Sequence, residues 1–244
     1  MRLHVFYRAC DGERMEIRPR FFSKLTCLKN FINALRQVNT AAFYLIYDGK
    51  LREDFRVLVE PIGTIEVLPN VGNSASFWYA FQKAVNLPND HLIYFVEDDY
   101  LHCPDALKKL IECIEDVPAD YVTLYDHPVR YMPDYPLGGD WPLNENAIYI
   151  SRSHHWRTVE STCMTFAARA EVLKEDTPIF EIHVHQTRKP ADRELFRQLQ
   201  GLGKYRQDAP LRKLVGPIPS LATHCHVPWL APMVDWQKIA DESR

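Results

Sequence analysis

The stretch that decides the fold is LIYFVEDD, residues 92–99, in which five apolar or aromatic residues run directly into three carboxylates. The apolar run is typical of a β-strand that is buried on both faces. In an open α/β sheet, ligands bind at the carboxyl ends of such strands. Glu97, Asp98 and Asp99, here termed the acidic triplet, repel one another, so their pKa values should rise unless a cation such as a divalent metal compensates. The alternative is a solvated acidic turn.

Strand and helix patterns alternate on both sides of this stretch. Short apolar runs predict strands over 3–7, 43–47, 64–68 and 121–124. Apolar residues at helical spacing predict helices that begin near Ser23, Ser74 and Pro104. This order predicts an α/β fold of the Rossmann-like kind, in which helices cover both faces of a mostly parallel central sheet. Residues that follow neighbouring strands, such as Arg8 and Asp48, should then meet the acidic triplet at one edge.

The second half of the chain has a different character. Residues 126–161 are rich in proline, tyrosine, tryptophan and histidine and show little periodicity. A loop region of this length inside a compact domain is usually functional, and its aromatic content argues against disorder. A return strand is predicted over 163–167, and a helix is predicted to open at Pro190 and end at Gly201. We therefore expect an irregular second half attached to a regular first half.

Composition places the chain among ordinary globular proteins and excludes several classes of function. The 244 residues carry a net charge of -3, which provides no global basic field for nucleic acid. No stretch has the run of about 20 apolar residues that a membrane span needs, and the first residues do not resemble a signal peptide. We expect at most peripheral contact with the inner face of a membrane. The cysteines show no CxxC spacing, which predicts reduced thiols in a cytoplasmic protein.

Several short motifs resemble those of the GT-A glycosyltransferases. VEDDY (96–100) is similar to the Glu-Asp-Asp form of the DxD motif, as in the family 2-like N-acetylglucosaminyltransferases. ADREL (191–195) resembles the ED helix start of many inverting members, with Ala191 in place of the first acid. Three further matches are similar to the family's base-reading aspartate, its Asn-x-Gly donor stretch and its C-terminal histidine ligand: Asp48, NVGNSAS (70–76) and His224.

The resemblance implies a single GT-A-like domain over residues 1–244, with a nucleotide-sugar-binding half over 1–125 and an acceptor-binding and catalytic half over 126–244. It implies a metal-dependent glycosyltransferase that moves a sugar from a nucleotide-diphospho sugar, most simply a UDP- or GDP-sugar. The acceptor would be a hydroxyl of a glycan, a lipid-linked molecule or another compound. The cofactor would be Mn²⁺ or Mg²⁺, which stabilises the charge that develops on the diphosphate leaving group.

The resemblance also assigns metal and donor roles to individual residues. Asp99 and His224 would hold the metal. Apart from the resemblance, His226 points to the same side as His224 if this segment is extended, so both histidines could reach one metal or one could face the substrate. The donor would be bound by polar residues at the strand ends: Arg8, Asp48, Asn70, Asn73, Glu97 and Asp98. The alternative interpretation is a surface salt bridge for Arg8 and a plain Asp-Gly turn for Asp48.

The acceptor hydroxyl needs a general base, for which Asp192 is the first candidate and Glu194 the reserve. The positive end of the helix dipole is expected to lower the pKa of Asp192 and so to favour its ionised form. Helix capping is the alternative role for Asp192. The helix motif favours an inverting reaction, and a retaining one becomes possible if neither carboxylate faces the donor carbon.

The aromatic segment is expected to shape the acceptor site. Trp141, His155 and Trp156 offer flat faces for a sugar ring, and Asp140 is placed to bind an acceptor hydroxyl. The alternative is that these rings only pack a long loop onto the sheet.

Three other interpretations stay open. A zinc site at His224-Cys225-His226 would need further ligands such as His183 and His185. A nucleotidyltransferase also places carboxylates and Mg²⁺ at a strand end, but it normally has a glycine-rich basic loop after the first strand, where residues 8–20 contain only one glycine. A catalytically degenerate domain of the same kind would bind nucleotide or glycan without turnover.

Overall fold

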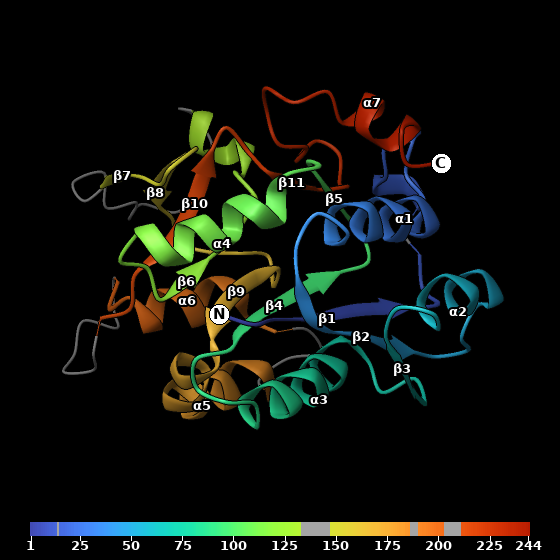
Figure 1. The fold of residues 1–244 in the computed structure, drawn as a ribbon, viewed down its shortest axis with the longest axis horizontal. Coiled ribbons are helices and arrows are strands. Elements are labelled where there is room, and N and C mark those ends of the chain that lie inside the picture. The colour runs from blue at the N-terminus through green and yellow to red at the C-terminus, as the bar shows by residue number, and fades with distance from the viewer. Residues whose placement is uncertain (14, 133–146, 186–189, 203–210) are drawn as a thin grey trace.

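The computed structural model describes residues 1–13, 15–132, 147–185, 190–202 and 211–244 (Figure 1). Its strands are β1 (Leu3–Cys10), β2 (Thr40–Asp48), β3 (Thr64–Leu68), β4 (Leu92–Glu97), β5 (Tyr100–His102), β6 (Tyr121–Val122), β7 (Ile148–Ile150), β8 (His155–Thr158), β9 (Phe166–Arg169), β10 (Leu214–Ile218) and β11 (Ala222–His224). Its α-helices are α1 (Lys24–Leu35), α2 (Glu53–Val59), α3 (Asn73–Val85), α4 (Ala106–Asp116), α5 (Ala170–His185), α6 (Asp192–Leu199) and α7 (Trp236–Asp241). Two short 3-10 helices are η1 (Met15–Ile17) and η2 (Pro128–Tyr131).

A nine-stranded sheet crosses the molecule in the order β3-β2-β1-β4-β9-β6-β10-β8-β7, and β5 pairs with β11 in a small second sheet. β1 is parallel to β2 and β4, β2 to β3, and β10 to β6. β9 and β8 run the other way, since β9 is antiparallel to β4 and β6, and β8 is antiparallel to β10 and β7. The prediction of a mostly parallel, Rossmann-like α/β sheet is confirmed.

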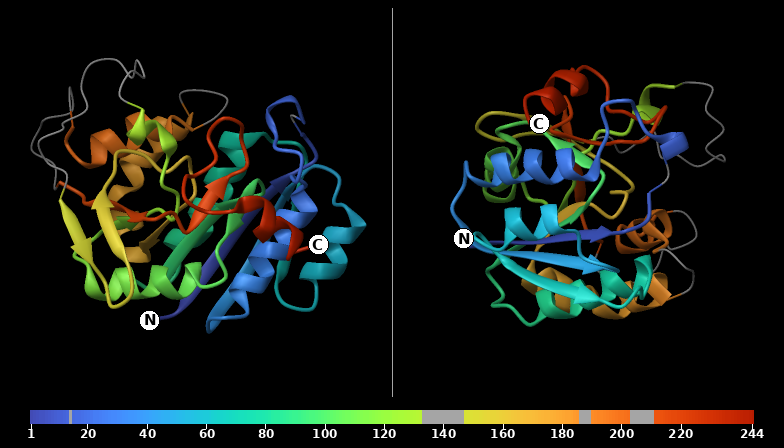
Figure 2. Two further views of the ribbon diagram at one scale, coloured as in Figure 1. Left: turned by 90° about the horizontal axis from the view of Figure 1, so that it is seen from above. Right: turned by 90° about the vertical axis from the view of Figure 1, so that its right-hand side faces the viewer.

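Helices cover both faces of the sheet and bury an apolar core on each (Figure 2). On one face, α1, α2, α4 and α7 close a core that includes Phe31, Phe55 and Leu107. On the other face, α3, α5 and α6 close a second core, in which Phe77 and Phe180 stack with ring centroids 6.2 Å apart. Burying each such side chain contributes about 1.5–3 kcal/mol, so both faces hold the sheet rigid. Within the described ranges, no helix has the length and apolarity to cross a membrane.

The register of β1 brings polar residues to one edge of the sheet. β1 continues to Cys10, beyond the predicted strand, so Arg8 lies beside Glu97 of β4 while Cys10 lies beside Asp48 of β2. Because these strands are parallel, their carboxyl ends coincide. The acidic triplet therefore emerges next to the residues that follow β1 and β2.

Several elements of the second half differ from the sequence prediction. The segment 126–161, predicted to be a loop region, contains η2 and the hairpin of β7 and β8. Helices α5 and α7 are absent from the prediction, as is α2 in the first half of the chain. The return strand lies at 166–169 rather than 163–167, because Cys163 and Met164 have φ values of 50° and 55° and cannot continue an extended strand.

Candidate active site

Each carboxylate of the acidic triplet meets a buried cation from another part of the chain. The pairs are Glu97 Oε1 with Arg8 Nη2 at 3.3 Å, Asp98 Oδ2 with Lys24 Nζ at 2.8 Å, and Asp99 Oδ2 with Arg18 Nη2 at 2.8 Å. The acidic triplet was predicted to need positive charge nearby, and Arg8, Lys24 and Arg18 supply part of it. The alternative of a solvated acidic turn is wrong, because these carboxylates are largely buried.

Arg18 and Lys24 are site residues that the sequence prediction missed. Lys24 opens α1, and its Nζ also donates to the carbonyls of Cys10 and Gly12 at 2.7 and 2.5 Å, which ties the loop back to the end of β1. Arg18 follows η1 and donates through Nη1 to the carbonyl of Cys225 at 2.8 Å. The only sequence signal for either residue is the run of basic residues after the first strand.

Burial and charge separate the three carboxyl groups. Burial raises the pKa of Glu97 to about 7, although a neighbouring arginine opposes the rise. Burial also raises the pKa of Asp98 against the attraction of a lysine. Burial would raise the pKa of Asp99 as well, but His224 and Arg18 together hold it below the usual value. Asp99 therefore stays ionised across the neutral range.

Asp99 and His224 meet although they are far apart in the sequence. Nε2 of His224 lies 3.0 Å from Oδ2 of Asp99. The pairing of β11 with β5 sets this contact, since it places His224 opposite Tyr100, and the two rings stack at 5.3 Å with an angle of 4°. Burial lowers the pKa of His224, but Asp99 outweighs burial and raises it. The ring of His226 lies 5.4 Å from that of His224, and burial lowers its pKa.

These residues suit a divalent cation with an incomplete set of protein ligands. Oδ1 of Asp99 is buried and has no hydrogen-bond partner among the residues that the structure describes, so it is an open oxygen ligand beside an imidazole. A carboxylate oxygen and an imidazole nitrogen leave further positions for phosphate oxygens and water. Within the described ranges, no three His, Cys, Asp or Glu side chains group as a metal site. The zinc alternative therefore has no site there, and Nε2 of His183 instead lies 2.6 Å from Oε1 of Gln198.

Arg8 and Asn73 lie together on the side of the edge where the donor is expected. Nη2 of Arg8 donates to Oδ1 of Asn73, the first residue of α3, at 2.8 Å. Nε and Nη1 of Arg8 are buried and have no partner among the described residues. Such guanidinium N–H groups fit the oxygens of phosphate. The alternative interpretation of Arg8 as a surface ion pair is wrong, because its side chain is buried.

Asp48 holds the turn that leads into α3. Its two carboxylate oxygens accept hydrogen bonds from the backbone N–H groups of Val71 and Gly72, both at 2.7 Å. In this turn Asn70 and Gly72 have φ values of 54° and 89°, which an unsupported chain seldom adopts. Each carboxylate oxygen of Asp48 can accept a further hydrogen bond in addition to the one it has. Contact of Asp48 or Asn70 with a nucleotide-sugar donor stays a prediction.

Asp192, the first residue of α6, holds the segment that precedes β9. Its Oδ1 accepts from Oγ1 of Thr162 at 2.6 Å and from the N–H of Met164 at 3.0 Å, and its Oδ2 accepts from the N–H of Thr162 at 3.1 Å. Burial raises the pKa of Asp192. The prediction that the helix dipole lowers this pKa is therefore wrong, because desolvation outweighs the dipole and the hydrogen bonds.

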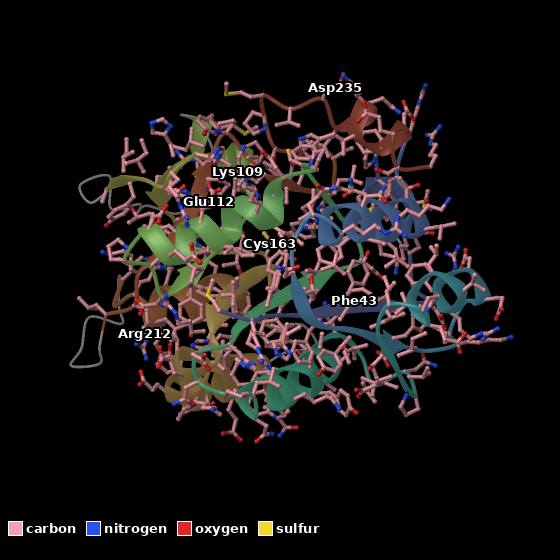
Figure 3. All side chains as sticks on the ribbon, viewed as in Figure 1. Phe43, Lys109, Glu112, Cys163, Arg212 and Asp235 are labelled. Atoms are coloured by element: carbon pink, nitrogen blue, oxygen red, sulfur yellow. The ribbon has the colours of Figure 1, made fainter. Side chains whose placement is uncertain are left out.

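Residues 162–165 connect Asp192 to the acidic triplet. Beyond the bonds to Asp192, Oγ1 of Thr165 accepts from the N–H of Glu97 at 3.3 Å. Cys163, labelled near the centre of the view in Figure 3, belongs to this segment. Burial raises the pKa of its thiol, and the charges of Asp192 and Glu97 add to the rise. Asp192 and Glu97 therefore both lie near Cys163, and Glu194 follows Asp192 in the first turn of α6.

The predicted acceptor residues differ in their exposure to solvent, and two of them are not described. Asp140 and Trp141 lie outside the described residues. His155 is exposed on β8, whereas the neighbouring Trp156 is fully buried and donates through Nε1 to Oγ of Ser151 at 3.0 Å. The prediction that Trp156 offers its ring to an acceptor is wrong in this structure, because the ring packs into the core.

No family model matches the chain, and no curated protein matches it. Solved structures do match its fold. HddC from Yersinia pseudotuberculosis is 12% identical over 100% of both chains, with a TM-score of 0.52. A CMP:2-keto-3-deoxy-manno-octonic acid synthetase complexed with CTP is 13% identical over 88% of this chain and 89% of its own, with a TM-score of 0.51. The expected resemblance to GT-A-like nucleotide-sugar enzymes is confirmed at the level of the fold.

Proposed function

We propose that the protein is a metal-dependent transferase that moves a sugar from a nucleotide-diphospho sugar to a hydroxyl acceptor. One observation carries the proposal: Asp99 and His224, 125 residues apart in the sequence, meet at 3.0 Å at the carboxyl end of a buried strand. A divalent cation bound there would offset the negative charge that grows on the diphosphate as the glycosidic bond breaks. Mn²⁺ suits this pair better than Mg²⁺, because one ligand is an imidazole nitrogen.

The donor is held by the cations and carboxylates around this pair. Nε and Nη1 of Arg8 and Nε of Arg18 are buried without a partner among the described residues, and they are available for the oxygens of the diphosphate. Glu97, whose pKa burial raises to about 7, can donate a hydrogen bond to a hydroxyl when protonated and accept one when ionised. Glu97 and Asp98 therefore suit the hydroxyls of the ribose or the sugar.

Asp192 is the candidate base for the acceptor hydroxyl. The raised pKa of its carboxyl makes the carboxylate a better proton acceptor than an ordinary aspartate. Its hydrogen bonds to Thr162 and Met164 fix the orientation of the carboxylate. A base opposite the departing diphosphate would invert the configuration at the sugar carbon.

A nucleotidyltransferase is the second candidate, and one observation favours it. Arg18 and Lys24 both reach the acidic triplet from the segment after β1, which is where that class of enzyme carries its basic residues. Such an enzyme would join a sugar phosphate to a nucleoside triphosphate and release pyrophosphate.

Product analysis separates the candidates. The protein is incubated with Mn²⁺ and UDP-, GDP-, dTDP- or CMP-sugars, and separately with nucleoside triphosphates and sugar 1-phosphates. The proposed transferase slowly releases free sugar from one nucleotide sugar even without an acceptor, and Asp99→Asn abolishes the release. Pyrophosphate release in the second incubation would support the nucleotidyltransferase instead. Nucleotide binding without either product would identify a degenerate binding domain.

A further inference from the structure

A second charged cluster lies beside the candidate active site, and none of the roles assigned above uses it. We term it the arginine cluster; its members are Asp126, Arg130, Arg157, Glu160, Arg193 and Arg197. They come from the segment after β6, from η2, from β8 and the residues that follow it, and from α6. These elements are separated in the sequence, and the fold brings the six side chains together.

Two buried carboxylates anchor the cluster. Asp126, 2% exposed, accepts a hydrogen bond from Nη2 of Arg157 at 2.5 Å. Glu160, 5% exposed, has its Oε2 at 3.4 Å from Nη1 of Arg197 and at 3.9 Å from Nε of Arg193. The two arginines of α6 are one helical turn apart, so they face the same carboxylate.

Arg130 joins these two groups into one cluster. Burial lowers the pKa of Arg130 to about 10, and repulsion from Arg157 adds to the effect while Asp126 and Glu160 oppose it. Arg130 therefore interacts electrostatically with the carboxylates of Asp126 and Glu160 and with the guanidinium group of Arg157. Among the described residues, four guanidinium groups converge on two carboxylates.

Two buried polar atoms of the cluster have no hydrogen-bond partner in the described structure: Nε of Arg157 and Oε1 of Glu160. An unpaired buried donor or acceptor costs free energy, so native proteins rarely retain one without a ligand or an ordered water. An unused donor and an unused acceptor, surrounded by guanidinium groups, fit a ligand that has both an anionic group and a hydroxyl.

The cluster adjoins both parts of the candidate active site. Arg193 directly follows Asp192, the candidate base, on α6. Tyr125, which precedes Asp126, stands edge-on to His224 with ring centroids 6.5 Å apart. A ligand held by the arginines therefore lies next to the donor site rather than on a remote surface.

We infer that the arginine cluster binds an anionic acceptor, a small molecule in which a phosphate or carboxylate group accompanies the hydroxyl that receives the sugar. This inference rests on the proposed transferase function. The arginines bind the anion, and Oε1 of Glu160 accepts a hydrogen bond from a second hydroxyl. In the transfer, the acceptor oxygen bonds to the sugar carbon, its proton passes to Asp192, and the nucleoside diphosphate leaves with the electron pair of the broken bond.

Calorimetric titration of the full chain with three small probes tests the inference. Glycerol 3-phosphate carries a phosphate, glycerate carries a carboxylate, and glycerol is the uncharged control. We expect at least one anion to bind while glycerol does not. Arg157→Gln and Arg193→Gln should each weaken that binding by about tenfold or more, as expected for loss of a charge-assisted hydrogen bond. Arg56→Gln makes the same charge change on the exposed face of α2 and should bind as the wild type does.

Three results would overturn the inference: no binding of either anion, equal binding of glycerol, or undiminished binding by both arginine variants. Arg193 is 39% exposed, so its substitution should leave the fold intact even if that of Arg157 does not, and circular dichroism checks this. A parallel titration with UDP and Mn²⁺ keeps the two proposals apart. Absence of UDP binding in the wild type would contradict the proposed function, while the anion titration still reports on the cluster.

Discussion

Asp99 and His224 show how far single residues could be predicted. A C-terminal histidine was expected to approach the last acid of the triplet, and the structure brings the two side chains to 3.0 Å. Arg18 and Lys24 could not be predicted, because a cation becomes a buried partner only once the loop after β1 folds back over the sheet. Trp156 was predicted to contact the acceptor but is buried in the core. In a segment without periodicity, the sequence does not indicate whether an aromatic ring packs inward.

The two neighbouring histidines give a matched test of the metal assignment. His224→Gln removes the nitrogen that lies 3.0 Å from Oδ2 of Asp99. His226→Gln removes a ring that lies 5.4 Å from the ring of His224. We expect the first substitution to weaken Mn²⁺ binding in the presence of UDP by more than about tenfold and the second to weaken it less, because only His224 contacts Asp99 directly. Calorimetric titration with Mn²⁺ measures both. Equal losses in the two variants would show that His224 has no special part in binding the metal.

At the scale of elements, the first half of the chain was predictable and the second half less so. β1, β2, β3 and β4 carry apolar runs bounded by polar residues, and each lies where expected with small shifts of its ends. The hairpin of β7 and β8 was not predicted. Ile148 and Ile150 lie on the edge strand β7 and are exposed, so they do not belong to a buried strand. α5 was missed because it buries Asp176 and His183 and contains Pro178, which interrupt a helical pattern.

Asp192 joins two elements, and its substitutions separate a structural role from a catalytic one. Asp192→Ala removes the hydrogen bonds that hold Thr162 and Met164 to α6, so we expect the free energy of unfolding to fall by about 1–3 kcal/mol. Asp192→Asn retains one acceptor oxygen but cannot take the proton, so sugar transfer should fall by about 100-fold or more with a smaller loss of stability. Urea unfolding and a transfer assay measure the two effects. Unchanged transfer in Asp192→Asn would leave the attachment of Thr162 and Met164 to α6 as the only role of Asp192.

At the scale of the whole molecule, the alternation of buried strands and helices was enough to predict the class of fold. Each strand of the parallel part needs a helix on either face, and the two apolar cores meet that need. The position of the site follows from the same architecture, since parallel strands end together. The identity of the acceptor residues did not follow, because they come from segments whose arrangement depends on the antiparallel strands β9 and β8.

Buried histidines should make stability depend on pH. Burial lowers the pKa of His102 to about 3. The unfolded chain, with the usual histidine pKa of 6.5, then binds a proton that the folded protein refuses, so the stability linked to His102 is complete above pH 6.5 and declines as the pH falls toward 3. Glu97 has the opposite sign, since its raised pKa makes stability decline as the pH rises from 4.5 toward 7.

The effect of His102 is therefore measured as a difference between proteins. We expect the stability advantage of the wild type over His102→Gln to shrink by up to about 1.4 kcal/mol per pH unit between pH 6.5 and pH 4. Urea unfolding at several pH values gives this slope. His155→Gln, at an exposed position, is the control and should unfold in parallel with the wild type. A pH-independent difference for His102→Gln would contradict burial of an uncharged ring.

The most direct test of the central claim is the thermal stability of the wild type and Asp99→Ala with UDP, GDP, CDP or dTDP, each with and without Mn²⁺. A ligand that binds only the folded protein stabilises it by about 2.7 kcal/mol at a hundred times its Kd, which raises Tm by several degrees for a domain of this size. We predict that one nucleotide raises Tm only when Mn²⁺ is present, and that the Asp99→Ala protein shows no such rise. A rise that is indifferent to Mn²⁺ and to Asp99, or no rise with any nucleotide, would contradict a metal-dependent nucleotide-sugar site at the end of β4.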